Sequence, residues 1–243
     1  MAQQEKWTES DTDLFLQYGK IFAPERNEWA KAFAELIPAD KEELFTAVDL
    51  GTGGGWLAET LLSHYPNAKV IAMDGSEGML KHTKERLEQY ESRLELRQFD
   101  LYEDSWLLEL QVDVKCFVSS LVIHHLELNG KQQLFHNLYR KLNAGGAVLI
   151  ADVVKPASEM SRSWMGKHWA ETTKKQSFDY DGSLNAYDYF TKEKWNLFDY
   201  PDDPIDKPST LLEQLKALEG AGFSGVDVFW AKSGHAMFGG YKK

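Results

Sequence analysis

The sequence predicts an α/β fold built on a doubly wound sheet of mostly parallel strands, and three observations indicate it. Short apolar runs alternate with helical patterns between residues 47 and 154. Such alternation is typical of a parallel sheet with helices on both faces. A turn with four glycines, residues 51–55, joins the first apolar run to the first helical pattern. Two strand patterns around a short turn near the end of the chain predict an antiparallel hairpin, and seven strands in all.

The predicted elements follow in order along the chain. Residues 8–37 have apolar positions at helical spacing and stop at Pro38, so residues 8–40 are expected to form a helical cover. The helical pattern at 130–142 runs into Asn-Ala-Gly-Gly, which favours a helix C-cap there. Five strands are expected at residues 47–50, 69–74, 94–100, 112–121 and 147–154, and further helices run through residue 65 and over 76–90.

Residues 155–208 interrupt this pattern, because they hold ten aromatic residues and no clear strand. The segment is too apolar for a disordered linker, so it is expected to fold as a helical lid over the pocket, or as a small satellite core. A helix at 209–222 with Ser209 as its N-cap and strands at 225–232 and 236–242 complete the chain. We expect residues 1–243 to form one domain with this lid inserted after the fifth strand.

Composition limits the partners and the compartment. The net charge of −11 works against binding of a nucleic-acid backbone. No apolar run reaches the roughly 18 residues of a membrane span, and the first residues do not resemble a signal peptide. The single cysteine, Cys116, excludes an intrachain disulfide. We therefore expect a cytoplasmic protein with a small-molecule partner, neither nucleic acid nor membrane, and the possibility of a homodimer stays open.

The glycine turn does not fit the common phosphate-binding motifs. A dinucleotide site needs Gly-x-Gly-x-x-Gly, but counting from Gly51 places Trp56 where the third glycine belongs. A Walker-type loop needs Gly-Lys-Ser/Thr, which does not follow. Asp49 precedes Gly51 by two residues and would repel a polyphosphate. The pattern suits a ligand that carries an ammonium and a sulfonium.

Acidic residues also follow the next two strands. Asp74 ends the second predicted strand about 20 residues after the turn, where a carboxylate can bind both ribose hydroxyls. Asp100 ends the third predicted strand and can accept a hydrogen bond from an exocyclic amine such as that of adenine. Because parallel strands end at one edge of a sheet, Asp49, Asp74 and Asp100 are expected to lie along that edge.

The segments "VDLGTGGGW", "VIAMDGSEGML", "QFDLYE", "CFVSSLVIHHL" and "LNAGGAVLIADVV" together resemble the successive motifs of class I S-adenosylmethionine-dependent methyltransferases. The closing "GAGFSGVDVFWAKSGHAMFGGYK" resembles the last helix and reversed hairpin of that family. The resemblance covers about residues 15–243. It implies the class I methyltransferase fold and S-adenosyl-L-methionine as cofactor.

The resemblance also implies a role for individual positions. Backbone at Gly51 and Gly53 approaches the methionine moiety, with Asp49 organising that loop. Asp74 binds ribose, Gly75 and Met79 flank the adenine, and Asp100 and Leu101 hold its edge and face. Ser119 or Ser120 lies beneath the amino-acid portion, and Tyr18 closes over the cofactor.

His124 and His125 follow the fourth predicted strand and are the candidate catalytic residues, with a role as general base if the acceptor is protonated. The alternative is that one fills the space under the next helix and the other is solvated. Neither has a carboxylate or cysteine nearby in the sequence at metal spacing, so no metal site is expected. Asp152 ends the fifth strand and could meet a substrate group or cap the lid.

The expected function is in-line transfer of a methyl group from S-adenosylmethionine to an oxygen or nitrogen of a small molecule. Alignment and exclusion of water are the main tasks of the protein in such a displacement. Two alternatives stay open: modification of tRNA or another macromolecule, and a non-catalytic protein that binds S-adenosylmethionine or S-adenosylhomocysteine. A nicotinamide oxidoreductase is the last alternative.

Overall fold

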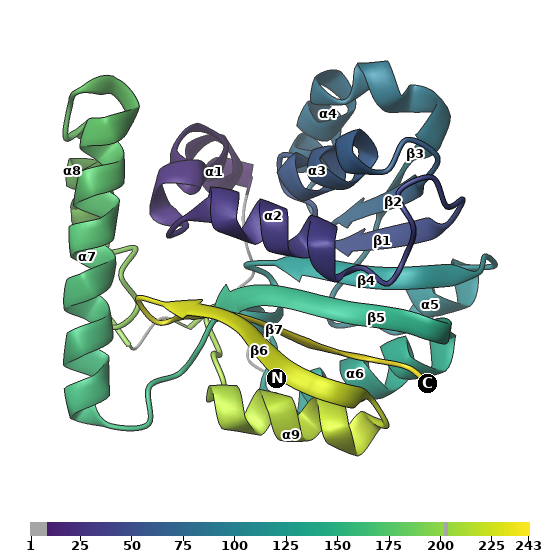
Figure 1. The fold of residues 1–243 in the computed structure, drawn as a ribbon. Helices are drawn as coiled ribbons and strands as arrows, with labels where there is room; N and C mark the ends of the chain where they lie inside the picture. Colours follow the sequence, from purple (N-terminus) through teal and green to yellow (C-terminus); the bar gives the residue numbers. More distant parts are fainter. Residues whose placement is uncertain (1–8, 202–203) are drawn as a thin grey trace.

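The computed structural model describes residues 9–201 and 204–243, and a seven-stranded sheet forms the centre of this part (Figure 1). The strand order is β3-β2-β1-β4-β5-β7-β6. Neighbours from β3 to β5 pair in parallel, and β7 pairs antiparallel with both β5 and β6. This confirms the predicted doubly wound sheet with a C-terminal hairpin. The strands are β1 Thr46–Leu50, β2 Lys69–Asp74, β3 Leu94–Gln98, β4 Val114–Ser120, β5 Leu142–Val153, β6 Ser224–Lys232 and β7 His235–Tyr241.

Helices bury both faces of the sheet, as Figure 1 shows. Helices α2 (Arg26–Leu36), α3 (Trp56–His64) and α4 (Glu77–Arg86) cover one face. Helices α5 (Ser105–Glu109), α6 (Leu128–Lys141) and α9 (Leu211–Ala221) lie on the other. Alternate residues of one strand therefore enter two cores: Ala47 of β1 packs in the α2–α3 core, and Val48 packs in the α6–α9 core. Burial on both sides explains why most residues of the central strands are apolar.

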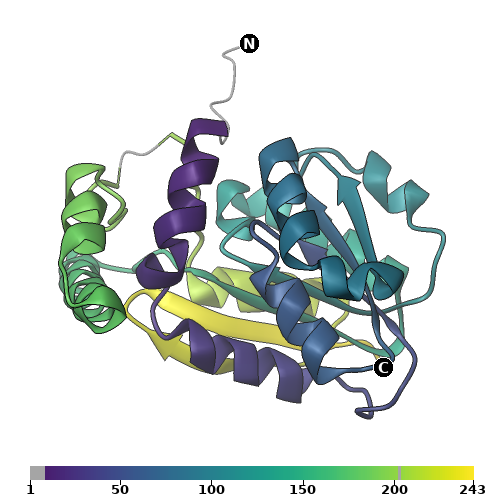
Figure 2. The ribbon, with the colours of Figure 1, turned by 90° about the horizontal axis from the view of Figure 1, so that it is seen from above.

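A third group of helices packs beyond the carboxyl ends of the parallel strands (Figures 1 and 2). It comprises α1 (Glu9–Phe22), α7 (Glu159–Asp181) and α8 (Asn185–Lys192). Trp169 of α7 joins them, because its indole N–H donates to the Phe22 carbonyl at 2.8 Å and its ring packs on Phe190. Six of the ten aromatic residues of 155–208 thus belong to an apolar core that includes the N-terminal helix, whereas Trp164, Phe178, Tyr180 and Tyr200 are exposed. As the sequence predicts, no strand occurs in the described part of 155–208.

Two predicted helix ends are wrong. Helix α6 ends at Lys141, and the Asn-Ala-Gly-Gly segment belongs to β5, where Gly145 has φ +73°. That glycine accompanies an irregularity in the β4–β5 pairing, so it serves a bulge and not a helix cap. The N-cap of α9 is Thr210, whose side chain forms a capping box with Glu213, and Ser209 lies one residue earlier.

Several other boundaries differ from the predicted ones. The N-terminal pattern divides into α1 and α2, because Glu25 between them has φ 52°. The helix expected at 76–90 ends at Arg86 and continues as a 3₁₀ helix, η1 (Glu88–Arg93). Residues 1–8 and 202–203, which include the first residue of the predicted cover and part of the predicted lid, lie outside the described residues. Among the described helices, none combines the length and the apolar character needed to cross a bilayer.

Candidate active site

A cavity of about 580 Å³ lies at the carboxyl ends of β1, β2 and β4. This is the edge of the sheet where the sequence predicts ligand binding. The predicted site residues that line the cavity are Gly51, Gly53, Asp74, Gly75, Met79, Asp100, Leu101, Ser120 and His125. The structure therefore brings together most of the residues that the sequence singled out. Tyr18, Asp49, Ser119 and His124 are not among the lining residues.

The glycine loop turns under the cavity with left-handed backbone. Gly51 has φ +70° and Gly53 has φ +52°. A Cβ on Gly51 would lie 2.1 Å from a methyl group of Val122, so only glycine fits between β1 and the residues after β4. The Asp74 carboxylate accepts hydrogen bonds from the Gly53 N–H at 2.8 Å and the Ser76 N–H at 2.9 Å. Asp74 thus ties the loop to the end of β2 while it faces the cavity.

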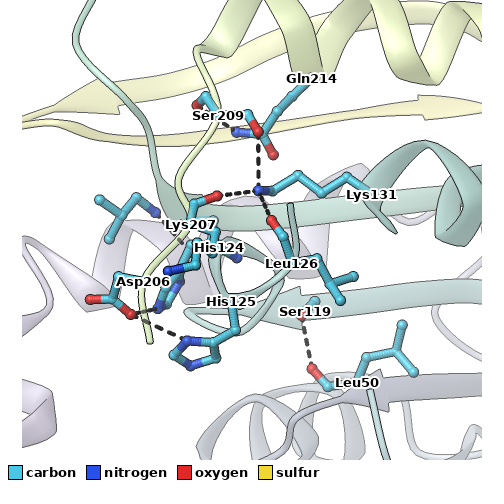
Figure 3. Close-up of polar contacts among 12 residues, drawn as sticks. Leu50, Ser119, His124, His125, Leu126, Lys131, Asp206, Lys207, Ser209 and Gln214 are labelled. Carbon is cyan, nitrogen blue, oxygen red and sulfur yellow. Dashed lines mark hydrogen bonds and ion pairs between the residues drawn. The ribbon is translucent and has the colours of Figure 1, made fainter. Parts of the chain in front are cut away.

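Asp49 and Ser119 act behind the cavity wall. Asp49 is buried and accepts a hydrogen bond from the Thr52 hydroxyl at 2.7 Å. Burial raises the pKa of the Asp49 carboxyl to about 7, and the bond from Thr52 opposes this rise. The Ser119 hydroxyl donates to the Leu50 carbonyl at 2.8 Å (Figure 3). These two side chains therefore hold the glycine loop and the end of β1 in place.

Among the described residues, the lining of the cavity carries carboxylates and no lysine or arginine side chain. Asp74 and Asp100 are at the wall, and no lysine or arginine is among the described lining residues. A phosphate would find no counter-charge from these side chains, whereas a cationic ligand with hydroxyl groups would find acceptors. The Ser120 hydroxyl is buried at the same wall and has no hydrogen-bond partner among the described residues. A ligand atom can supply that partner.

The two histidines lie on η2 (Ile123–His125), directly after β4. The backbone enters this turn through Leu121, a cavity-lining residue with φ 57°. His125 reaches the cavity, and His124 is buried behind it. His124 Nδ1 lies 2.5 Å from one oxygen of Asp152, and the backbone N–H of His124 donates to the other oxygen at 2.9 Å. Asp152 therefore fixes the turn through His124.

Asp206 joins the two histidines from the other side (Figure 3). One of its oxygens lies 3.3 Å from His124 Nε2 and 3.2 Å from His125 Nδ1. Asp206 lies in the predicted lid segment, between α8 and α9, and its neighbour Ile205 lines the cavity. No sequence pattern predicts a site role for either residue. The only signal is an acidic, proline-rich stretch at residues 201–208, which could equally be a solvated loop.

The two histidines differ in their pKa values. Burial by itself lowers the pKa of His124, but Asp152 and Asp206 outweigh it and raise that pKa to about 10. Burial and the neighbouring His124 cation lower the pKa of His125, against the effect of Asp206. Burial also works against ionisation of Asp206, yet the two histidines hold its pKa well below the ordinary value. Near neutral pH, His124 is a cation and His125 is a neutral imidazole.

Two expectations about this region can be set beside the structure. No carboxylate follows the histidines in the sequence at metal spacing, but Asp152 and Asp206 reach them from distant parts of the chain. The absence of a metal stays a prediction. Tyr18 is not among the described lining residues and packs on Tyr189, with ring centroids 5.5 Å apart, so its predicted role at the cofactor stays a prediction. Leu16 on the same helix approaches the glycine loop, since a Cβ on Gly54 would lie 2.8 Å from its methyl group.

Comparisons with known proteins agree with this geometry. Residues 47–146 match a protein family described as a methyltransferase domain. Acetylserotonin O-methyltransferase of Gallus gallus is 27% identical over 135 residues, which are 55% of this chain and 37% of that protein.

Two solved structures share the fold over nearly the whole chain. An O-methyltransferase family 2 protein from Planctomyces limnophilus, in complex with apigenin, has a TM-score of 0.62 and 19% identity, over 97% of this chain and 62% of its own. Human N-acetylserotonin methyltransferase, in complex with S-adenosylmethionine, has a TM-score of 0.52 and 16% identity, over 97% of this chain and 59% of its own. The chain spans less than two thirds of each of these three proteins. The sequence of residues 47–146 is thus similar to a methyltransferase domain, and the chain has the class I methyltransferase fold.

Proposed function

We propose that this protein transfers a methyl group from S-adenosylmethionine to a hydroxyl oxygen of a small molecule. One observation carries the proposal: the same cavity has two carboxylates and no lysine or arginine in its described lining at one end, and a neutral histidine beside Asp206 at the other. The first end suits a cationic nucleoside, and the second suits removal of a proton from an acceptor. A reducing, cytoplasmic compartment fits the single, buried Cys116.

The residues present fit S-adenosylmethionine. Backbone at Gly51 and Gly53 would approach its methionine portion, and the buried Ser120 hydroxyl would gain a partner there. Asp74 would bind the ribose hydroxyls, and Asp100 with Leu101 would hold the adenine, flanked by Gly75 and Met79 as the resemblance implies. When bound, S-adenosylmethionine supplies a methyl group already activated by its sulfonium. Human N-acetylserotonin methyltransferase, which shares this fold, is known in complex with the same molecule.

The chain's own residues would then orient the acceptor and take up its proton. His125 is neutral near pH 7 and faces the cavity, so its imidazole can accept the proton of a hydroxyl group. Asp206, within 3.2 Å of His125 Nδ1, would stabilise the imidazolium that forms. His124, held between Asp152 and Asp206, would keep Asp206 ionised and in place. The apolar side chains of Leu121, Val122 and Ile205 would exclude water.

Oxygen is favoured over nitrogen as the acceptor atom, because a hydroxyl needs a base whereas a neutral amine does not. A small molecule is favoured over a nucleic acid, since the net charge is −11 and the described lining has no cationic side chain. The chicken relative is named an O-methyltransferase, and the Planctomyces limnophilus neighbour is known with apigenin. Phenols are therefore the first acceptor class to examine.

The test has two steps on the full chain. Titration calorimetry with S-adenosylhomocysteine and with NADH should show binding of the first and none of the second. Incubation with S-adenosylmethionine and a panel of phenols that includes apigenin, followed by mass spectrometry, should show a product heavier by one methylene group. Binding of NADH with no binding of S-adenosylhomocysteine would overturn the cofactor assignment. Tight cofactor binding without turnover of phenols, carboxylic acids or amines would favour a non-catalytic binding protein.

A further inference from the structure

Lys131, in the first turn of α6, is completely buried although it carries an ammonium group. Its Nζ donates three hydrogen bonds, as Figure 3 shows. The acceptors are the Leu126 carbonyl, the Lys207 carbonyl at 2.6 Å and the Ser209 hydroxyl at 3.1 Å. An ammonium has three donor hydrogens, so its hydrogen-bonding capacity is filled.

The three acceptors come from the two segments that carry the candidate catalytic groups. Leu126 directly follows the His124–His125 turn, and Lys207 directly follows Asp206. The Lys131 side chain thus holds one segment next to His125 and the other segment next to Asp206. One backbone bond joins the same segments, since the Lys207 N–H donates to the His124 carbonyl at 2.7 Å.

Burial of a lysine is costly unless its charge is compensated, and packing alone does not require it here. A methionine has similar length and would fill the same volume, but it would leave the three oxygen atoms without their donor. Burial lowers the pKa of Lys131 to about 8, while Asp152 favours its charged form. The ammonium therefore fixes the distance between the histidine turn and the Asp206 segment, which an apolar side chain cannot do.

We propose that Lys131 is a positioning residue that sets the distance between Asp206 and the two histidines. The effect of Lys131 on catalysis rests on the proposed function, because Lys131 acts through His125 and Asp206 and touches neither the cofactor nor the acceptor. The geometry itself can be tested without any acceptor.

The test compares Lys131→Met with Lys242→Met in the full chain. Lys242 is a matched control, because its Nζ also donates to two backbone carbonyls, those of Tyr139 and Leu142, at the far end of α6. Side-chain ¹⁵N NMR titrations of His124 and His125 with S-adenosylhomocysteine present are the main readout. In Lys131→Met, Asp206 should withdraw, and the pKa of His124 should fall by about one unit or more. Lys242→Met should titrate like the wild type.

Two further measurements separate positioning from general loss of structure. The affinity of Lys131→Met for S-adenosylhomocysteine should stay within about twofold of the wild type, and methyl transfer to an accepted phenol should fall by about tenfold or more. If no acceptor is methylated by the wild type, the proposed function fails, while the titrations still decide the role of Lys131. Folded Lys131→Met with wild-type histidine titrations would overturn the proposal.

Ser209→Ala keeps the proposal falsifiable if Lys131→Met does not fold. This variant removes one acceptor of the ammonium and keeps the charge. It should lower the pKa of His124 by a smaller amount in the same direction. Unchanged histidine titrations in folded Ser209→Ala, with Lys131→Met unfolded, would show that Lys131 supports only the fold and would overturn the proposal.

Discussion

The two ends of the cavity are built in different ways. At the nucleoside end, Gly51, Asp74 and Asp100 come from three consecutive strand ends. Hydrogen bonds between backbone and side chain, such as that from the Gly53 N–H to the Asp74 carboxylate, fix the loop there. At the histidine end, His125 meets Asp206 from the segment after α8, and Asp152 and Lys131 hold them from two further elements. The nucleoside end thus depends on local loop geometry. The histidine end depends on long-range contacts that the lid segment completes.

This contrast predicts that the two ends fail separately when they are altered. Substitutions at the nucleoside end should weaken cofactor binding, and substitutions at the histidine end should slow methyl transfer with little change in that binding.

The largest effect is expected for Gly51→Ala. Its Cβ would overlap Val122, and φ +70° is strained for alanine, so the loop must shift. The free energy of unfolding should fall by about 2–5 kcal/mol, and S-adenosylhomocysteine should bind at least about a hundredfold more weakly. Thermal unfolding and titration calorimetry measure both quantities.

Gly145→Ala is the matched control for Gly51→Ala. Gly145 has φ +73° but open space where the added methyl group would lie, so only the backbone strain of about 1–2 kcal/mol remains. The cofactor affinity of this variant should equal that of the wild type. Equal losses of affinity in both variants would show that backbone strain, and not the fit against Val122, controls the loop.

Asp206→Asn tests the histidine end. Methyl transfer should fall by about 10²–10⁴-fold, because the imidazolium of His125 loses its carboxylate, while cofactor affinity should change little. In the wild type, the rate should rise with pH as His125 loses its proton. That rise should be centred below the ordinary histidine pKa, since burial and His124 lower the pKa of His125. A rise centred well above that value would contradict the assignment of His125 as the base.

Asp74→Asn should have a smaller effect, confined to binding. The amide keeps an oxygen acceptor for the Gly53 N–H but loses the charge that would bind the ribose hydroxyls under the proposed function. The affinity for S-adenosylhomocysteine should fall by about tenfold, and the rate at saturating cofactor should be nearly unchanged. Calorimetry and saturation kinetics distinguish these outcomes. A loss of rate with normal cofactor affinity would contradict the assignment of Asp74 to cofactor binding.

The last prediction concerns stability at high pH and involves neither cofactor binding nor methyl transfer. The folded-state pKa of His124 is raised to about 10 from an ordinary value of 6.5, so its pairing with Asp152 and Asp206 stabilises the fold fully below pH 6.5. This contribution is lost as pH rises through about 10. The difference in unfolding free energy between the wild type and His124→Asn should therefore shrink from pH 6.5 to pH 10. Chemical denaturation at several pH values measures it, and a constant difference would contradict the raised pKa.

The position of the nucleoside end could be predicted from the sequence, because each of its residues lies at or just after the end of a predicted strand. The rule that parallel strands end at a common edge of the sheet is enough to predict that Gly51, Asp74 and Asp100 lie near one another. The histidine end could be predicted only for the turn that bears His124 and His125. Asp206 lies in a stretch without periodicity, and its approach depends on how α7 and α8 pack against α1. The sequence contains no local signal for such packing, and for the same reason it does not indicate that Leu16 approaches the glycine loop.

Titration calorimetry of S-adenosylhomocysteine into Asp74→Asn and Asp206→Asn, side by side with the wild type, tests most directly that the two ends have separate roles. Separate roles predict that binding weakens by about tenfold in Asp74→Asn and stays within about twofold of the wild type in Asp206→Asn. Equal weakening in both variants, or normal binding in Asp74→Asn, would contradict them.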